Sequence, residues 1–163
     1  MGRIALLVDG NNLSHEYLGR RKLYPVLNIA LDRLEDIGDV TLKWLYLDEA
    51  DYGMASYASS LGFTEKSIGM PADRKIKDAI KEICHNRMID TICLGSGDGD
   101  FCHDLSQIKR YNKGSIVLGL YGKISWRLCN EADHIITIYE DEIKEFDSTC
   151  IEYLDRFFSQ QNG

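Results

Sequence analysis

The chain has 163 residues, of which 44% are hydrophobic and 28% charged, and this ordinary composition excludes disorder and favours a single domain over residues 1–163. Its 19 basic and 26 acidic residues give a net charge of −7, which excludes a protein that coats nucleic acid by positive charge, but not an enzyme whose carboxylates hold metal ions. The aliphatic run at residues 4–8 is too short to span a membrane, and residues 1–3 lead into it without a cleavage site, so we expect a cytoplasmic protein with no membrane partner.

Short apolar segments alternate with helical patterns along the whole chain. In chain order we predict a strand at 4–8, a helix at 23–37, a strand at 40–47, a helix at 54–61, an amphipathic helix through 76–88, a strand at 91–94, a helix at 101–111, a strand at 115–120, a short helix near 125–129, a strand at 134–138 and a final helix at about 140–159. This alternation is typical of an α/β fold with helices packed around a mainly parallel sheet.

Polar side chains follow two of the predicted strands directly. Asp9, Asn11 and Asn12 come after the first strand, and Ser96, Asp98 and Asp100 come after the strand at 91–94. If both strands are central, their carboxyl ends bring these carboxylates into one crevice, where oxygen ligands favour Mg²⁺ or Mn²⁺. The open alternative is that these residues are ordinary turn formers.

Motifs of other protein classes are absent or incomplete. The glycine-rich segment at 95–100 has Asp100 where a dinucleotide-binding fingerprint needs its third glycine, and a carboxylate there would repel a pyrophosphate. There is no P-loop, no complete EF-hand loop and no H-E-x-x-H pair. The five cysteines include no C-x-x-C motif, so we expect reduced, unpaired thiols.

Four sequence blocks, in order and with their spacing, resemble the NYN domain in the LabA-like branch of the PIN-like nucleases. The blocks are ALLVDGNNL at 5–13, Lys75-x-x-Asp78, LGSGDGDF at 94–101 and Ser125-x-x-Leu128-x-x-x-Ala132-Asp133, and the resemblance extends over about 3–138. It implies a three-layer α/β/α sandwich in which clustered acidic residues bind Mg²⁺ or Mn²⁺ and cleave RNA.

The resemblance also assigns roles to individual residues. Four carboxylates are implied to be catalytic, and the first, third and fourth of them to be direct metal ligands: Asp9, Asp78, Asp98 and Asp100. Substrate-binding or orienting roles are implied for Asn11, Ser96 and Ser125. Lys75 lies one helical turn from Asp78, where it could meet a phosphate beside the metal.

Asp78 is the least regular of these positions. The family often has Lys-Gly-hydrophobic-Asp where this chain has Lys75-Ile76-Lys77-Asp78, and Asp78 falls opposite the apolar face of its predicted helix. That placement is also typical of a solvated surface carboxylate. Asp133 precedes its strand, so we expect a structural role there.

Aromatic and basic side chains suggest less specific contacts. Tyr17, Tyr24 and Trp126 could stack on bases or simply pack, and short basic clusters at 20–22, 74–77 and 109–113 suit a solvated surface.

The sequence favours a metal-dependent ribonuclease acting on RNA, or on single-stranded DNA. One alternative is a catalytically silent module of the same fold that binds nucleic acid, a nucleotide or a protein. Another is a phosphate-accepting receiver-like protein, with Asp48 as acceptor. The oligomeric state stays open between monomer and homodimer.

Overall fold

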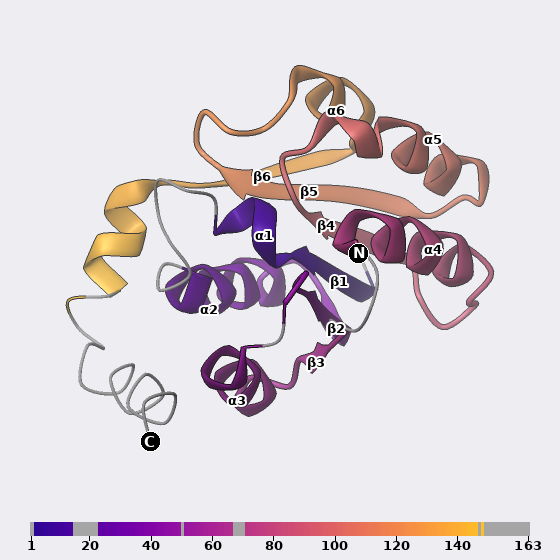
Figure 1. Ribbon diagram of the computed structural model, residues 1–163. Coiled ribbons are helices and arrows are strands. Elements are labelled where there is room, and N and C mark those ends of the chain that lie inside the picture. The colour runs from indigo at the N-terminus through magenta and orange to yellow at the C-terminus, as the bar shows by residue number, and fades with distance from the viewer. Residues whose placement is uncertain (1, 15–22, 50, 67–70, 147, 149–163) are drawn as a thin grey trace.

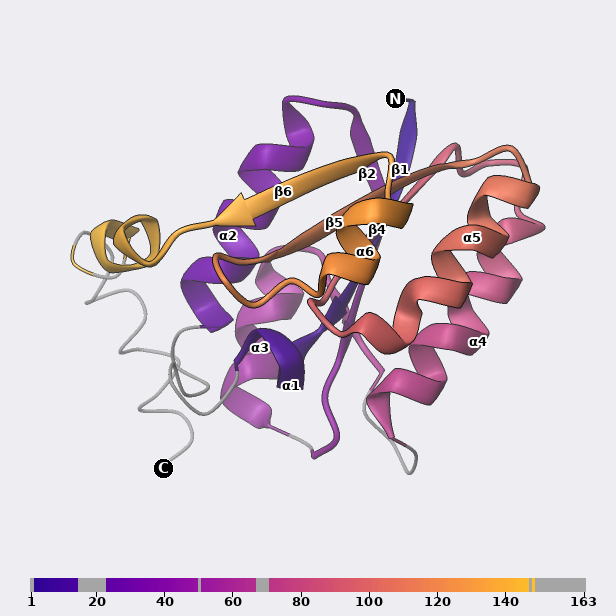
Figure 2. The same cartoon turned by 90° about the horizontal axis from the view of Figure 1, so that it is seen from above.

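Six parallel strands form one sheet in the order β3-β2-β1-β4-β5-β6 in the computed structural model, which describes residues 2–14, 23–49, 51–66, 71–146 and 148 (Figures 1 and 2). The strands are β1 (Arg3–Asp9), β2 (Asp39–Tyr46), β3 (Thr64–Glu65), β4 (Thr91–Gly95), β5 (Gly114–Leu120) and β6 (His134–Ile138). The predicted parallel α/β fold is therefore confirmed. Every strand runs in the same direction, so all six carboxyl ends lie along one edge of the sheet.

Helices cover both faces of the sheet and make the fold a three-layer sandwich (Figure 1). The helices are α1 (Gly10–Leu13), α2 (Leu23–Glu35), α3 (Tyr52–Ser60), α4 (Ala72–Cys84), the 3₁₀ turn η2 (Gly99–Phe101), α5 (Cys102–Arg110) and α6 (Trp126–Glu131). One hydrophobic core lies between the sheet and α2 with α3, and the other lies between the sheet and α4, α5 and α6.

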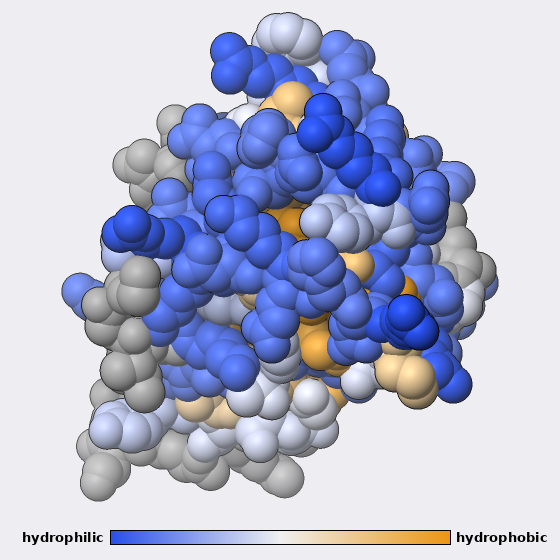
Figure 3. All heavy atoms as spheres, turned by 90° about the vertical axis from the view of Figure 1, so that its right-hand side faces the viewer, coloured by the Kyte–Doolittle hydropathy of each residue, from blue (hydrophilic) through white to orange (hydrophobic). Residues whose placement is uncertain are grey.

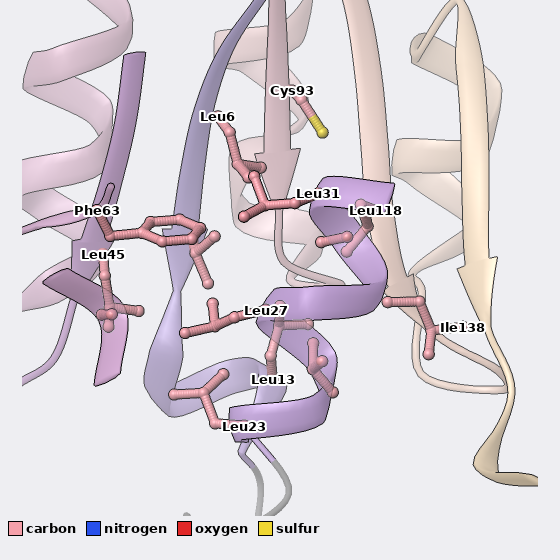
Figure 4. Close-up of a cluster of buried hydrophobic side chains, with 14 of the residues drawn as sticks. Leu6, Leu13, Leu23, Leu27, Leu31, Leu45, Phe63, Cys93, Leu118 and Ile138 are labelled. Atoms are coloured by element: carbon pink, nitrogen blue, oxygen red, sulfur yellow. The ribbon is translucent and has the colours of Figure 1, made fainter. Parts of the chain in front are cut away.

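Strand β1 supplies both cores because its side chains alternate between the two faces. Ile4, Leu6 and Val8 join the core under α2, while Ala5 and Leu7 join the core under α4, and all five are fully buried. A parallel strand covered on both faces needs apolar residues at every position, and the continuous apolar run in the sequence reflects this. Figure 4 shows the first of these cores, where leucines of α2 reach toward Leu6 and Leu118.

The order of the strands sets the place of the site. The chain builds outward from β1 through β2 to β3, then returns to β4 beside β1 and builds outward on the other side through β5 to β6. A crevice opens between the carboxyl ends of β1 and β4, where the connections leave in opposite directions. The receiver-like alternative is wrong. A receiver domain has the strand order 2-1-3-4-5, in which β1 lies between β2 and β3, whereas here β1 lies between β2 and β4.

Several element boundaries differ from the predicted ones for local reasons. The segment after β1 is a single helical turn, α1, whose N-cap is Asp9. Helix α4 begins at Ala72 and ends at Cys84, so Met88 lies beyond it in a turn and is 60% exposed. After β6 the described chain is helical over 140–146, and the rest of the predicted final helix lies outside the described residues.

The described cysteines are all free, as expected for reduced thiols: Cys84, Cys93, Cys102 and Cys129. Burial raises the pKa of the Cys84 and Cys93 thiols, which keeps both protonated and unreactive.

None of the helices in the described part of the chain has the length and apolar character needed to cross a bilayer. On the face shown in Figure 3, hydrophilic side chains predominate and apolar ones form only small, separate areas.

Candidate functional site

Asp9 stands at the centre of the carboxyl edge, at the end of β1, with only 6% of its side chain exposed. One carboxylate oxygen, Oδ1, accepts a hydrogen bond from the backbone N–H of Asn12 at 3.3 Å and so caps helix α1. The other oxygen, Oδ2, accepts from the hydroxyl of Ser96 at 3.3 Å. The two hydrogen bonds hold this carboxylate across the gap between β1 and the loop that follows β4.

Ser96 connects the Asp9 carboxylate to the backbone of Asp98. It is fully buried, and its Oγ also accepts a hydrogen bond from the backbone N–H of Asp98 at 3.2 Å. Asp98 in turn caps the turn η2, because its Oδ1 accepts from the backbone N–H of Asp100 at 2.9 Å. The loop is also tied to α1, since the Asn12 side chain accepts from the N–H of Gly97 at 2.8 Å.

The two glycines of this loop let the β5–α6 connection pack directly against it. A Cβ atom on Gly97 would lie 1.9 Å from the carbonyl oxygen of Lys123, and one on Gly99 would lie 2.6 Å from Oγ of Ser125. Ser125 donates its N–H to the carbonyl of Gly97 at 2.9 Å, and its hydroxyl caps α6 by accepting from the N–H of Arg127 at 3.3 Å. The glycines therefore serve close packing, and Ser125 serves as a cap.

A hollow of about 270 Å³ opens in front of Asp9, and we call it the acidic hollow. Its polar lining consists of four carboxylates and two carboxamides, Asp9, Asp48, Asp73, Asp98, Asn11 and Asn12. Pro71 and Ala72 complete it. The structure thus brings together Asp9, Asp98 and Asn11, three of the predicted site residues.

Two lining carboxylates, Asp48 and Asp73, are not among the predicted site residues. Asp48 follows β2, and its Oδ1 accepts a hydrogen bond from the N–H of Ala72 at 2.9 Å, which anchors the start of α4 beside the hollow. Asp73 lies in the first turn of α4, directly after that anchor. A signal for Asp73 exists in the sequence, because Pro-Ala-Asp is typical of a helix start, but a helix drawn from residue 76 leaves it out.

The other predicted residues on α4 lie elsewhere. Asp78 and Lys75 line a separate hollow of about 360 Å³ beside Trp44 and Tyr46, and neither lines the acidic hollow. The Lys75 ammonium group donates to the carbonyl of Lys66 at 3.4 Å. Lys77 is the basic residue of this helix that reaches the site loop: its Nζ donates to the carbonyl of Asp100 at 3.0 Å and lies 3.7 Å from Oδ2 of Asp104.

Asp100 is exposed and lines a third hollow together with residues of α5 and α6, and it does not line the acidic hollow. Asp133 has a structural contact, as expected: its Oδ2 accepts from the N–H of Ser115 at 3.0 Å and joins the start of β6 to β5.

Tyr24 is buried against Tyr57 with ring centroids 4.7 Å apart, so it packs in the core and does not stack on bases. Tyr17 and the basic cluster at 20–22 lie outside the described residues.

Burial makes Asp9 the most perturbed carboxylate of the acidic hollow. The pKa of Asp9 is raised from 3.8 to about 6, mainly by burial and to a smaller extent by the negative charges of Asp98 and Asp48. The hydrogen bonds from Asn12 and Ser96 act in the opposite direction. A carboxylate that resists ionisation in this way gains from a cation placed beside it.

The chemistry of this lining fits a hard divalent cation. All polar atoms offered by the six lining side chains are carboxylate or carboxamide groups, with no thiolate or imidazole among them. Within the described residues no three acidic, histidine or cysteine side chains form a ready-made metal site. Mg²⁺ does not require one, because it commonly binds through one or two carboxylates and completes its shell with water and substrate phosphate.

Comparison with known proteins identifies the family. The family model of the NYN domain matches residues 3–140, which is most of the chain. The chain belongs to the NYN domain family. This family is part of the PIN-like superfamily, and the match does not assign the chain to the LabA-like branch.

Two similar proteins agree with this family assignment, and the description of neither names an activity. An uncharacterized protein of Methanocaldococcus jannaschii is 31% identical over 144 residues, which cover 85% of this chain and 56% of that protein. The NYN chain thus spans little more than half of that relative's length. A crystal structure of a protein of unknown function from Vibrio parahaemolyticus is similar with a TM-score of 0.64 and 25% identity, over 85% of this chain and 94% of that one.

Membership implies a nuclease-like fold and nucleic-acid binding in general, and NYN and PIN-like nucleases typically use divalent metals.

Proposed function

We propose that this NYN chain is a metal-dependent ribonuclease that hydrolyses RNA phosphodiester bonds at the acidic hollow with Mg²⁺ or Mn²⁺. The observation that carries the proposal is the hydrogen-bonded series Asp9–Ser96–Asp98, which spans the carboxyl ends of β1 and β4 with Asp48 and Asp73 facing the same hollow. Such a concentration of negative charge around the buried Asp9 carboxylate is costly to keep and is typical of a site that a cation neutralises.

The residues have distinct proposed tasks. Asp9 and Asp98 hold the metal directly, and Asp73, rather than Asp78, supplies a further carboxylate from α4. Bound there, the ion would polarise the phosphate and lower the pKa of a water molecule. Ser96 keeps the Asp9 carboxylate oriented through its 3.3 Å hydrogen bond, and Asn11 offers a carboxamide to orient water or phosphate at the rim.

Asp100 keeps a proposed role at the edge of the site, since its backbone N–H orients Asp98 while its own side chain faces the next hollow. Asp78, Lys75 and Ser125 have no direct role in this proposal. We place the protein in the cytoplasm, with RNA as its substrate and single-stranded DNA as a substrate class to be compared.

An assay on a mixed RNA pool tests the proposal. Wild type is expected to cleave when Mg²⁺ or Mn²⁺ is present and to stop when EDTA is added. Asp98→Asn is expected to lose at least about tenfold in rate while keeping the fold, because it removes the charge but keeps an acceptor for the N–H of Asp100. Cleavage that survives both EDTA and this substitution would contradict the metal mechanism.

A catalytically silent binding module is the second candidate. The observation that favours it is that, of the four carboxylates predicted to be catalytic, Asp9 and Asp98 line the acidic hollow while Asp78 and Asp100 line other hollows. Protein that takes up Mn²⁺ and binds RNA, yet cleaves neither RNA nor single-stranded DNA, would establish this function instead.

A further inference from the structure

Trp126 is unusually exposed for a large aromatic side chain and lies close to the site loop. It begins α6, and 70% of its side chain is open to solvent. It forms part of the wall of a hollow of about 750 Å³ between α5 and α6, which we call the Trp126 hollow. Gly99, Asp100, Arg127 and Asn130 are among its other lining residues. Figures 1 and 2 show α5 and α6 side by side on one face of the sheet.

The Trp126 hollow adjoins the acidic hollow across a single turn of chain. Asp98 lines the acidic hollow, while the next two residues, Gly99 and Asp100, line the Trp126 hollow. The turn η2 and its N-cap Asp98 thus contribute residues to both hollows. A polymer that is bound at the acidic hollow and continues past η2 would come next to the hollow that Trp126 lines.

The position of Trp126 relative to the site loop is fixed by the backbone. The residue before it, Ser125, donates its N–H to the carbonyl of Gly97 at 2.9 Å. The absence of a Cβ atom on Gly97 and on Gly99 is what allows this approach. The backbone next to Trp126 is therefore hydrogen-bonded to the same loop that presents Asp98.

The lining of the Trp126 hollow suits a nucleobase better than a simple anion. The guanidinium carbon of Arg127 lies 6.0 Å from the centroid of the Trp126 ring. Asp100 and Glu131 offset the positive charge of Arg127, so charge alone does not explain binding there. A flat indole stacks on any base, the Asn130 carboxamide can donate and accept hydrogen bonds, and the volume is within the usual range of small-ligand sites.

We propose that the Trp126 hollow is a base-stacking subsite for single-stranded polynucleotide, which receives a nucleobase close to the phosphodiester bound at the acidic hollow. This subsite rests on the proposed function, since the acidic hollow is taken to hold the same strand. The ligand chemistry, a base on a sugar–phosphate chain, is shared by RNA and single-stranded DNA.

Fluorescence can observe this subsite without turnover, because the chain has only two tryptophans, Trp44 and Trp126. In a Trp44→Phe protein, Trp126 is the only indole, and a base stacked on it quenches its emission. Octamers of uridylate, of thymidylate and of abasic deoxyribose phosphate are titrated at low salt with EDTA present, so that metal-dependent cleavage is blocked. Affinity is measured in parallel by anisotropy of labelled octamers on wild type and three variants.

We expect both base-containing octamers to quench Trp126 and the abasic octamer to leave its emission unchanged. Trp126→Ala should bind about tenfold more weakly than wild type, and Trp126→Phe should retain most of the affinity. Tyr111→Ala is the matched control, since Tyr111 is also exposed but lies at the far end of α5, and it should bind like wild type. Quenching by uridylate alone would assign the subsite to RNA. Equal quenching by uridylate and thymidylate would show that it accepts both RNA and single-stranded DNA.

Two results would overturn the proposal and separate it from the proposed function. Octamers that bind without quenching, with Trp126→Ala unaffected, would exclude the subsite and leave the nuclease proposal standing. Octamers that do not bind at all in EDTA would exclude the subsite, while binding of a polynucleotide at the acidic hollow, which we expect to depend on the metal ion, is scored separately with Mg²⁺ present. Metal-dependent cleavage is scored separately, so its absence with intact quenching would count against the nuclease alone.

Discussion

At the scale of single residues, Asp9 combines deep burial with two hydrogen bonds and two negative neighbours. The residue is 6% exposed and its pKa is about 6, so at neutral pH the folded metal-free protein holds an ionised group that burial disfavours. The cost of that ionisation, at most about 3 kcal/mol, reduces the stability of the fold and becomes available to a bound cation. This trade of stability against function is typical of active sites.

The pH dependence of stability follows from the direction of that shift. Between the ordinary pKa of 3.8 and the folded value of about 6, the folded state binds more protons than the unfolded state. The contribution of Asp9 to the free energy of unfolding therefore falls as pH rises through this window and stays low above it. Below pH 3.8 both states are protonated and the contribution is constant.

Asp9→Asn should therefore stabilise the metal-free protein at pH 7.5, by about 1–3 kcal/mol, while it abolishes metal-dependent cleavage. The amide can still accept from Asn12, and the Ser96 hydroxyl can turn to accept from it. Urea unfolding at pH 7.5 and pH 4.0 measures the effect, which should shrink at the lower pH. A variant that is less stable than wild type at pH 7.5 would show that Asp9 is not strained by its ionisation.

At the scale of elements, the site depends on how loops pack against one another at the carboxyl edge. Gly97 accommodates the carbonyl of Lys123, and Asp48 anchors the start of α4. The first contact positions the loop that presents Asp98, and the second fixes the start of α4 beside the acidic hollow. Both contacts join residues that lie far apart in sequence.

Gly97→Ala tests the first of these contacts. The added Cβ atom would lie 1.9 Å from the Lys123 carbonyl, and that atom belongs to the backbone, so the β5–α6 connection must move. We expect a loss of about 2 kcal/mol or more in the free energy of unfolding and a reduced cleavage rate. Gly122→Ala is the control, because a Cβ atom added at this nearby glycine would meet no heavy atom within 4 Å. Its φ of +76° still makes that substitution destabilising, by about 1 kcal/mol. Equal losses in both variants would mean that crowding at Gly97 is unimportant.

Two aspartates on α4 provide a matched pair for the side of the acidic hollow that this helix forms. Asp73 and Asp78 are both exposed and five residues apart, but only Asp73 lines the acidic hollow. Asp73→Asn should reduce the metal-dependent cleavage rate about tenfold or more, and Asp78→Asn should stay within about twofold of wild type. Initial rates at a fixed Mn²⁺ concentration compare them. The reverse order would restore Asp78 as the site carboxylate.

A feature of this structure can be predicted from the sequence when it depends on neighbouring residues, and it cannot when it depends on contacts between residues far apart. The strands are evident because a parallel strand buried on both faces must be continuously apolar, as at residues 4–8. Asp9 and Asp98 are evident because they directly follow two central strands. Asp73 is not, because its position depends on the hydrogen bond from Ala72 to Asp48, 24 residues away, which no local pattern encodes. The exposure of Trp126 likewise depends on tertiary packing.

At the scale of the whole molecule, a net charge of −7 opposes the binding of a polyanion. Part of that charge is gathered in the acidic hollow, where a divalent cation would neutralise it and offer a positive centre to phosphate. RNA affinity at constant ionic strength should therefore rise severalfold when Mg²⁺ replaces EDTA, and the rise should be smaller in Asp98→Asn. Anisotropy of a labelled RNA at an early time point measures it. An affinity that is unchanged by Mg²⁺ would place the bound strand away from the acidic hollow.

Direct Mn²⁺ binding tests whether the acidic hollow is a divalent-cation site. Free Mn²⁺ measured by electron paramagnetic resonance gives the affinity of wild type, of Asp98→Asn and of Asp36→Asn, an exposed carboxylate at the opposite edge of the sheet. We predict saturable binding of one or two ions by wild type and by Asp36→Asn, and an affinity at least about tenfold weaker in Asp98→Asn. Equal Mn²⁺ affinity in all three proteins, or no saturable binding by wild type, would contradict the account.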